Sequence, residues 1–547
     1  MATATPLLDS PNDSPLTPLR FLKRSAEVFP SKPAIVYGSR RYTYLQFAAA
    51  AETLARAIRE RIARGDRVAF LSPNTPEMLI AQFAVPLAGG ILVSLNPRLS
   101  PSEVRYVLDH SEATLLFYDA EFASVVGDSL EHCPSLRSII EIGDVEFGCA
   151  VSGVEIGQES FADFESAGAA AERPVRWEID DERAVISINY TSGTTGKPKG
   201  VMYSHRGAYL NAMGEVFHNG LDNKSVYLWT LPLFHCNGWC TPWAVTAASG
   251  THVCLRAVRP ESIWSAIDDL GVTNLCGAPT VCTVIANADQ AHLLEHPLRI
   301  TTAGAPPSPT IIERLERLGA TVVHVYGLTE AYGPFTICEY QGAWDGLTPA
   351  ARATMIARQG VSMVQAEAPR VVDENMNDVA RDGSTIGEIV LRGNNVMIGY
   401  YRDEAATATA FAGGWFHTGD LGVMHSDGYV EVKDRAKDII ISGGENISSI
   451  EVENSIASHP SVADVAVVAF PHETWGERPE AYVLLHEGHF ATGEEISTHA
   501  RLTLARFKVP DSVVFVDALP RTATGKVVKA SLRALSTQSN RPSPVWP

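Results

Sequence analysis

Thr191-Ser192-Gly193-Thr194-Thr195-Gly196-Lys197-Pro198-Lys199-Gly200 is the stretch of the chain that says most about its fold and chemistry. Its three glycines let the backbone turn tightly and aim successive N–H groups at one point. Four hydroxyls and two lysines add further donors, and an apolar run before them, Ala184 to Asn189, is typical of a buried strand. A strand that ends in such a loop predicts a cradle for phosphate groups.

The loop does not follow the P-loop pattern G-x-x-x-x-G-K-[ST]. Gly193 and Gly196 are separated by two residues instead of four, and Pro198 occupies the position of the magnesium-binding hydroxyl. A flexible surface loop rich in Ser, Thr and Gly is the alternative interpretation. Two lysines among so many small donors favour the phosphate cradle.

Helical and strand patterns alternate around this loop. Phe47, Ala51, Leu54 and Ile58 fall at helical spacing, and the apolar run 68–71 that follows predicts a buried strand. A helix is expected after Gly200, at the end of the loop, and further strands are expected over 225–231 and 251–256. This alternation predicts an α/β architecture in which largely parallel sheets are covered by helices.

The pattern changes past about residue 370. Short strands over 387–391 and 429–433, separated by turn residues, indicate a small β-rich part. From about residue 438 a helix (449–458), two strands (462–470 and 480–485) and another helix (497–504) predict a small α+β domain. We therefore expect two domains, residues 1–436 and 437–547.

Composition excludes several classes of protein. A net charge of −19 argues against a nucleic-acid-binding protein, and eight cysteines without compact spacing do not suggest a disulfide framework. The apolar run 79–95 is broken by Gln82, Pro86, Gly89 and Gly90, so we expect a buried helix, a turn and a strand instead of a membrane span. Neither end carries a recognised targeting signal, which favours the cytoplasm; a homodimer is left open.

Four further segments occur in order along the chain: Tyr326-Gly327-Leu328-Thr329-Glu330, Thr418-Gly419-Asp420, Asp434-Arg435 with Lys437, and Pro520-Arg521-Thr522-Ala523-Thr524-Gly525-Lys526. Together with the 191–200 loop they resemble the motifs of the adenylate-forming superfamily, which comprises acyl-CoA ligases, firefly-type luciferases and peptide-synthetase adenylation domains. Five motifs in the same order make this resemblance specific. It implies a large N-terminal domain followed by a mobile C-terminal one.

The resemblance implies a binding site for ATP and AMP. Tyr326 offers a flat face for adenine, small residues near 303–306 let the backbone approach the base, and Asp420 and Arg435 contact the ribose. The residues expected at this site are Thr191, Ser192, Gly193, Thr194, Thr195, Gly196, Lys197, Gly304, Ala305, Pro306, Tyr326, Gly327, Asp420 and Arg435.

The chemistry expected of this family joins a carboxylate to the α-phosphate of ATP. Two negative groups at about 4 Å repel by about 4 kcal/mol at an effective dielectric constant near 20, so the site must supply positive charge. By resemblance, Lys526 bridges the carboxylate and the α-phosphate. Glu330 binds Mg²⁺, with Thr329 beside it and Thr191 as a second metal contact.

A second half-reaction, in which coenzyme A attacks the adenylate, is implied by the same resemblance. Lys437 is the expected hinge about which the C-terminal domain rotates. The rotation removes Lys526 and brings Ser442, Gly443 and Gly444 near the pantetheine thiol.

The acyl group is expected to bind near Phe234-His235-Cys236-Asn237-Gly238-Trp239. His235 and Trp239, with Ala303, Gly304 and Leu328, are the expected lining. A bulky Trp239 favours short- or medium-chain acids. The string resembles plant acyl-activating enzymes and bacterial ligases, including those for methylthiopropionate, and makes a hydroxycinnamate substrate less expected.

These observations predict an ATP- and Mg²⁺-dependent acid–thiol ligase that forms acyl-CoA from a small carboxylate. One alternative is a free-standing amino-acid or aryl-acid adenylating enzyme, although an aspartate would be expected near His235 to pair with a substrate ammonium. A luciferase-like oxygenase is another. The third, a non-catalytic nucleotide-binding protein, has no use for a mobile Lys526.

Overall fold

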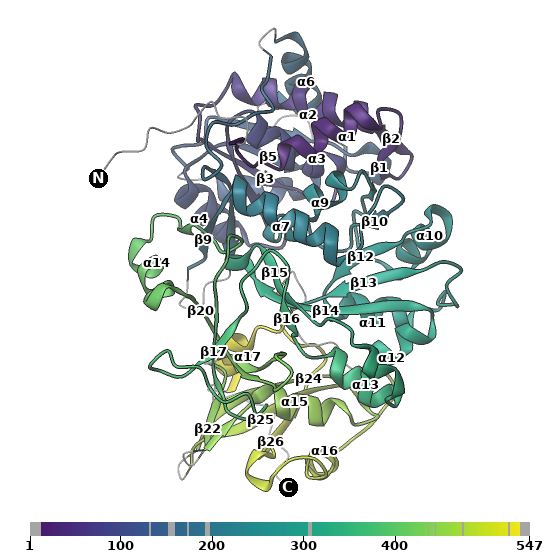
Figure 1. Ribbon diagram of the computed structural model, residues 1–547, viewed down its shortest axis with the longest axis vertical. Coiled ribbons are helices and arrows are strands. Elements are labelled where there is room, and N and C mark those ends of the chain that lie inside the picture. The colour runs from purple at the N-terminus through teal and green to yellow at the C-terminus, as the bar shows by residue number, and fades with distance from the viewer. Residues whose placement is uncertain are drawn as a thin grey trace.

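The computed structural model describes residues 13–130, 133–150, 159–171, 174–191, 197–304, 309–435, 437–442, 445–472, 475–522 and 526–536. Two large sheets and one small sheet make up the part before residue 436, and a fourth sheet lies after it. In Figure 1 the N-terminal elements, in purple and blue, occupy the top, and the C-terminal elements, in light green and yellow, occupy the bottom.

An eight-stranded sheet carries the expected phosphate cradle, residues 191–200, which we call the phosphate loop. Its strands in spatial order are β19 (Gly399–Tyr400), β9 (Lys199–Ser204), β8 (Val185–Thr191), β4 (Ile91–Leu95), β3 (Arg67–Leu71), β5 (Ala113–Asp119), β6 (Ser138–Ile142) and β7 (Glu159–Ser160). The six strands from β8 to β7 are mutually parallel, as the alternating pattern predicted, whereas β9 runs antiparallel to β8 and β19 runs antiparallel to β9.

A nine-stranded sheet forms the second layer. Its strands are β16 (Val361–Ser362), β15 (Gly333–Ile337), β14 (Ala320–Leu328), β13 (Leu298–Thr302), β12 (Asn274–Gly277), β10 (Val226–Leu228), β11 (Thr251–Val253), β1 (Pro33–Tyr37) and β2 (Arg40–Thr43). A four-stranded antiparallel sheet follows: β17 (Arg370–Val372), β18 (Gly387–Leu391), β20 (Phe416–Met424) and β21 (Val430–Arg435). It is the small β-rich part expected from the sequence.

The helices cover these sheets. Those before residue 436 are α1 (Leu19–Val28), α2 (Tyr44–Arg59), α3 (Pro76–Leu87), α4 (Pro101–Ser111), α5 (Ala123–Ser129), α6 (Phe161–Ala170), α7 (His205–His218), α8 (Cys236–Trp239), α9 (Thr241–Ala247), α10 (Pro260–Leu270), α11 (Pro279–Asn287), α12 (Pro309–Arg317), α13 (Pro349–Ile356) and α14 (Glu404–Ala410). Helix α2 shows why they form: Thr43 and Gln46 cap each other, and Phe47, Leu54 and Ile58 are fully buried at helical spacing.

The C-terminal part has a hydrophobic core of its own, built from residues between Ile440 and Val513. Its sheet comprises β23 (Glu445–Ile447), β22 (Ile440–Ser442), β25 (Gly476–Leu485), β24 (Val462–His472) and β26 (Ser512–Phe515), packed with α15 (Ser449–Ala457), α16 (Gly493–Ala500) and α17 (Lys529–Ser536). The helix expected over 497–504 was misplaced. It begins earlier because Thr492 and Glu495 form a capping box.

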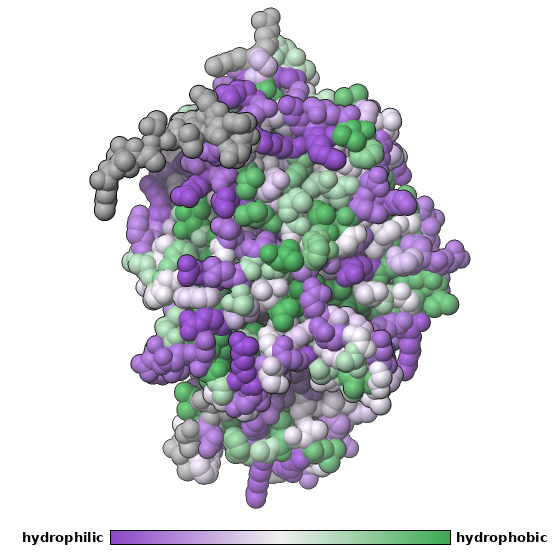
Figure 2. Space-filling view, viewed as in Figure 1, coloured by the Kyte–Doolittle hydropathy of each residue, from purple (hydrophilic) through white to green (hydrophobic). Residues whose placement is uncertain are grey.

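The outer surface mixes hydrophilic and hydrophobic side chains on the face seen in Figure 2. Among the residues placed by the structure, no helix is long and apolar enough to cross a bilayer. The run 79–95 forms buried helix α3, a turn and strand β4, as expected.

Candidate active site

The phosphate loop joins two paired strands. Thr191, the last residue of β8, lies opposite Lys199 at the start of β9. Ser192, Gly193, Thr194, Thr195 and Gly196 lie outside the described residues. The two lysines that follow are near aromatic rings: the Nζ atoms of Lys197 and Lys199 lie 5.5 and 4.7 Å from the ring centroids of Tyr106 and Tyr400.

The segment Thr329–Ala331, a 3₁₀ turn labelled η3, places the expected magnesium ligand next to this loop. The Tyr400 hydroxyl donates a hydrogen bond of 2.9 Å to Glu330 Oε1, and the same Tyr400 ring faces Lys199. Burial raises the pKa of Glu330, and the Tyr400 hydrogen bond and the Arg435 charge oppose that increase. A partly desolvated carboxylate of this kind gains from a nearby cation.

The expected nucleoside residues form one connected group. The Tyr326 hydroxyl donates to Asp420 Oδ2 at 2.8 Å, and Arg435 Nε lies 3.2 Å from Asp420 Oδ1. Asp420 and Arg435 are direct partners across β20 and β21, while Tyr326 comes from β14 of the neighbouring sheet. Burial, together with the Asp420 carboxylate, raises the pKa of Tyr326, so its hydroxyl remains a donor.

Gly327 is fixed by close backbone packing. A Cβ atom at this position would lie 1.8 Å from the carbonyl oxygen of Gly333, so the hairpin between β14 and β15 excludes any side chain there. Gly304 follows buried Ala303 after β13, with φ of 95°, in the left-handed region that favours glycine. Ala305 and Pro306 lie outside the described residues.

Lys526 comes from the C-terminal part and lies within electrostatic range of Asp420 and Arg435. The side chain remains accessible to solvent, yet surrounding protein removes part of its hydration. That desolvation and then the Arg435 charge lower its pKa to about 8, while Asp420 opposes the decrease. Burial and the Lys526 charge lower the pKa of His235 to about 4, so this imidazole is neutral at pH 7.

The residues after His235 form a left-handed turn. Five successive residues, Cys236 to Cys240, have φ between 50° and 63°, and only Gly238 lacks a side chain. Each of the others costs about 1–2 kcal/mol relative to a right-handed conformation, so tertiary contacts must hold the turn. Trp239, 5% exposed, packs against Gly333, where an added Cβ would lie 2.8 Å from its Cδ1. Leu328 pairs with Gly333 at the end of the hairpin.

The expected hinge lies between the two parts. Lys437 is exposed, and its carbonyl accepts a hydrogen bond of 3.3 Å from Arg533. Just before it, Asp434 Oδ2 accepts hydrogen bonds from the Ser449 backbone N–H at 2.6 Å and its hydroxyl at 2.7 Å. Ser442 is buried in β22, and Gly443 and Gly444 lie outside the described residues.

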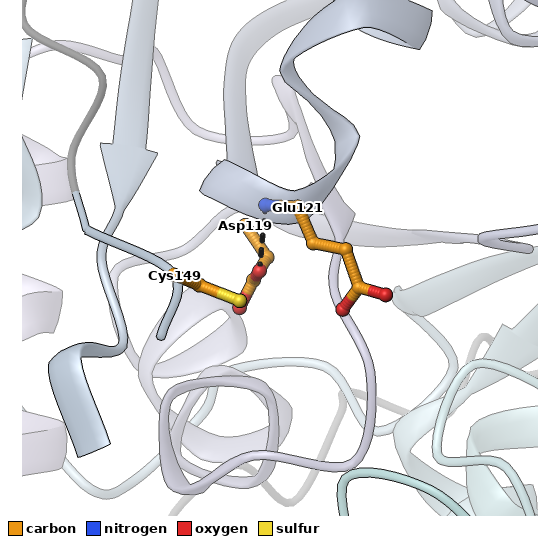
Figure 3. A group of neighbouring side chains, drawn as sticks. All are labelled: Asp119, Glu121 and Cys149. Carbon is orange, nitrogen blue, oxygen red and sulfur yellow. Dashed lines mark hydrogen bonds between the residues drawn. The ribbon is translucent and has the colours of Figure 1, made fainter. Parts of the chain in front are cut away.

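A different group of potential metal ligands is organised by an arginine. Asp119, Glu121 and Cys149 are neighbours in Figure 3, with the Asp119 carboxylate next to the Cys149 sulfur, and they form, within the described ranges, the one cluster of three or more such side chains. Arg256 lies among them, with Nη2 at 2.6 Å from Asp119 Oδ1, 2.8 Å from Glu121 Oε2 and 3.2 Å from Cys149 Sγ. The same guanidinium also pairs with buried Asp144 at 3.0 Å, so these side chains form an ion-pair network around Arg256.

Sequence reasoning missed two residues that the structure places at the site. Tyr400 links Glu330 to Lys199, but it belongs to no motif that the sequence identified. Asn237 stands in the string quoted for the acyl site but was given no role there; it is fully buried within the left-handed turn, and its amide makes three hydrogen bonds. A Gly-Tyr pair before a helix and an Asn beside a Gly were the available signals, and both usually mark ordinary turns.

The large and the small part of the fold each match a family model of nucleotide-binding enzymes. Residues 22–401 match the family described as AMP-binding enzyme, and residues 451–526 match the AMP-binding enzyme C-terminal domain. The protein belongs to this family of adenylate-forming enzymes.

Individual relatives match along nearly the whole chain. The acetate–CoA ligase CCL3 of Humulus lupulus is 43% identical over 544 residues, covering 96% of this chain and 95% of the relative. The peroxisomal trans-cinnamate:CoA ligase of Petunia hybrida is 41% identical over 544 residues, covering 96% and 95%. The solved o-succinylbenzoate CoA synthetase of Bacillus subtilis, in complex with an acyl-adenylate intermediate, has a TM-score of 0.80 at 27% identity and covers 96% of this chain and 99% of its own.

Proposed function

We propose that the protein is an AMP-forming acyl-CoA ligase. In the first half-reaction the carboxylate attacks the α-phosphorus of ATP, and pyrophosphate leaves. In the second, the thiol of coenzyme A attacks the acyl carbonyl of the adenylate, and AMP leaves. The proximity of Lys526 to Asp420, Arg435 and His235 carries this proposal, because it brings a cation from the C-terminal part to the expected nucleotide site.

The first half-reaction needs positive charge between two anions. Lys526 supplies it, and its ammonium loses less hydration energy on meeting the phosphates because surrounding protein has already displaced some water. Asp420 and Arg435 hold the ribose, and Tyr326 presents an aromatic face to the adenine. Neutral His235 lies near the carboxylate without adding a second charge.

The residues around Glu330 fit a magnesium ion. Mg²⁺ is usually held by one or two carboxylates, with phosphate oxygens and water completing its shell, so a single protein carboxylate beside the phosphate loop suffices. The raised pKa of Glu330 reflects a carboxylate that lacks full hydration. Glu330 is the ligand we propose, with Thr191 as a second contact; bound Mg²⁺ would neutralise phosphate charge.

The second half-reaction requires the C-terminal part to move. We place the boundary between residues 436 and 437, with Lys437 as the hinge and Ser442, Gly443 and Gly444 as the residues that then approach coenzyme A. The separate hydrophobic core between Ile440 and Val513 supports this boundary, since a lobe with its own core can rotate as a unit.

The acid is proposed to be short or medium in length. Trp239 packs on Gly333 beside His235 and, with Ala303, Gly304 and Leu328, limits the space for an acyl chain. Relatives named for acetate and for trans-cinnamate are almost equally similar, so overall identity does not choose between these acids. We propose the cytoplasm as the location, although several relatives, the Petunia hybrida ligase among them, are named peroxisomal. We leave a homodimer to be tested by sedimentation.

An acid panel tests the proposal. Acetate, butyrate, octanoate, dodecanoate, methylthiopropionate, benzoate and cinnamate are each incubated with ATP and Mg²⁺, with and without coenzyme A, and pyrophosphate, AMP and acyl-CoA are measured. Coenzyme A-dependent AMP release with a short acid is expected. Hydroxamate formation from amino or aryl acids without acyl-CoA would identify the alternative adenylating enzyme, and nucleotide binding without turnover would identify a non-catalytic protein.

A further inference from the structure

Among the side chains that bond the left-handed turn 236–240, that of Asn237 is fully buried and reaches two other elements of the fold. Its Nδ2 donates a hydrogen bond of 2.7 Å to Gln82 Oε1 on α3. Its Oδ1 accepts two more, each 2.7 Å, from Ser187 Oγ and Asn189 Nδ2. All four side chains are at most 2% exposed, so these bonds form away from bulk water, where an unpaired amide would be costly.

The partners of Asn237 show what it connects. Ser187 and Asn189 lie in β8, and this strand ends at Thr191, where the phosphate loop begins. The other side of the turn faces the metal-site segment: Cys236 Sγ lies 3.3 Å from Thr329 Oγ1, next to Glu330. Burial raises the pKa of Cys236 to about 12, so this contact involves a neutral thiol.

The backbone conformation at position 237 also favours asparagine. Asn237 has φ of 50° and ψ of 44°, in the left-handed region that asparagine tolerates better than most residues. The turn around it would relax toward ordinary geometry without an anchor. His235 directly precedes the turn, and Trp239 lies within it, so both side chains depend on its conformation.

We propose that Asn237 is a positioning residue that sets the alignment between the carboxylate substrate and the bound phosphates. It does so by tying the turn that carries His235 and Trp239 to the strand that ends in the phosphate loop. The inference rests on the proposed function, in which the acid binds at this turn. Asn237 touches neither substrate; it acts through His235 and Trp239.

Asn237→Gly removes the hydrogen bonds of the side chain without straining the backbone, because glycine accepts the left-handed conformation. We expect kcat/KM for the acid to fall by about 10- to 100-fold and KM for ATP to change by less than about threefold, since only the acid is misaligned. Preference among acids from acetate to octanoate should also broaden. Ser187→Ala, which removes one donor and keeps Asn237, should shift the same quantities in the same direction by a smaller factor.

Asn274→Ala is the matched control. Asn274 is another buried amide of the same part, and it donates 3.0 Å to the Asn219 carbonyl. The Asn274→Ala variant should have a lower melting temperature, with the KM for the acid and the chain-length preference unchanged.

Each outcome decides the inference. An unchanged acid KM and preference in Asn237→Gly, or equal losses for acid and ATP, would overturn it. If Asn237→Gly does not fold, Ser187→Ala decides: a selective change in acid KM supports the positioning role, and wild-type values for the acid refute it. Failure of the proposed function is distinct, because the unmodified protein would then form no acyl-CoA with any acid of the panel.

Discussion

The hydroxyl of Tyr400 donates a hydrogen bond of 2.9 Å to the carboxylate of Glu330, and the same ring lies 4.7 Å from the ammonium of Lys199. Tyr400 thus connects the proposed magnesium ligand with the end of the phosphate loop. Strand β19, which carries Tyr400, pairs with β9, which begins at Lys199, so the sheet itself maintains this relationship.

Tyr400→Phe should weaken the use of magnesium. Loss of the hydroxyl leaves Glu330 Oε1 without this donor and removes about 1 kcal/mol of orienting interaction. We expect the Mg²⁺ concentration for half-maximal pyrophosphate release to rise about fivefold, in line with that energy. Tyr401→Phe, at the neighbouring ring that packs on His110, is the control. Equal magnesium curves for Tyr400→Phe and the unmodified protein would remove Tyr400 from the site.

Trp239→Ala should lengthen the preferred acid. Trp239 is almost fully buried against Gly333, so its removal opens space in the proposed acyl site. Each additional CH₂ that enters this space gains up to about 0.8 kcal/mol, or about fourfold in kcat/KM. Measured from acetate to octanoate, the optimum should move toward longer chains. A uniform loss for every acid would instead indicate that Trp239 only supports the fold.

Lys437→Pro should separate the two half-reactions. Proline fixes φ and restricts the residue before it, so the proposed hinge loses its freedom while the observed arrangement of Lys526 is retained. Pyrophosphate release in a single turnover should persist, and acyl-CoA formation should fall by about 100-fold or more. Equal losses in both steps would argue against rotation about this residue.

Lys526 should give the first half-reaction an alkaline limit. Its pKa in the free protein is about 8, and the ammonium form is the active one, so kcat/KM for adenylation should decline above pH 8. Between pH 8 and the ordinary lysine pKa of 10.5, the unfolded chain holds this proton and the folded protein does not. The free energy of unfolding therefore increases, through this group, as the pH rises from 8 to 10.5. A pH–rate profile without a limb near 8 would contradict the assignment.

The local elements were predictable where the apolar spacing was regular. Helix α2 and strand β3 follow from residues 47–58 and 68–71, because one face of the helix is buried and residues 68–71 of the strand are buried on both faces. Strand β9 was missed, since it starts directly after the phosphate loop, where glycine, proline and lysine obscure the alternation. The start of α16 was missed because the Thr492–Glu495 capping box decided it.

The site was predictable as far as its motifs reached. The sequence pointed to Tyr326, Asp420, Arg435 and Lys526, and the structure brings them together. The contacts of Asn237 could not be predicted, because they depend on five successive left-handed residues, a conformation with no periodic pattern in sequence.

The central claim is that a cation from the C-terminal part serves the first half-reaction alone, and Lys526→Ala tests it most directly. The variant and the unmodified protein are each given acid with ATP, and separately given the synthetic acyl-adenylate with coenzyme A. Adenylate formation should fall by at least about 100-fold, while conversion of the supplied adenylate to acyl-CoA stays within about threefold of the unmodified rate. Undiminished pyrophosphate release by Lys526→Ala, or an equal collapse of both half-reactions in a variant that folds normally, would contradict the account.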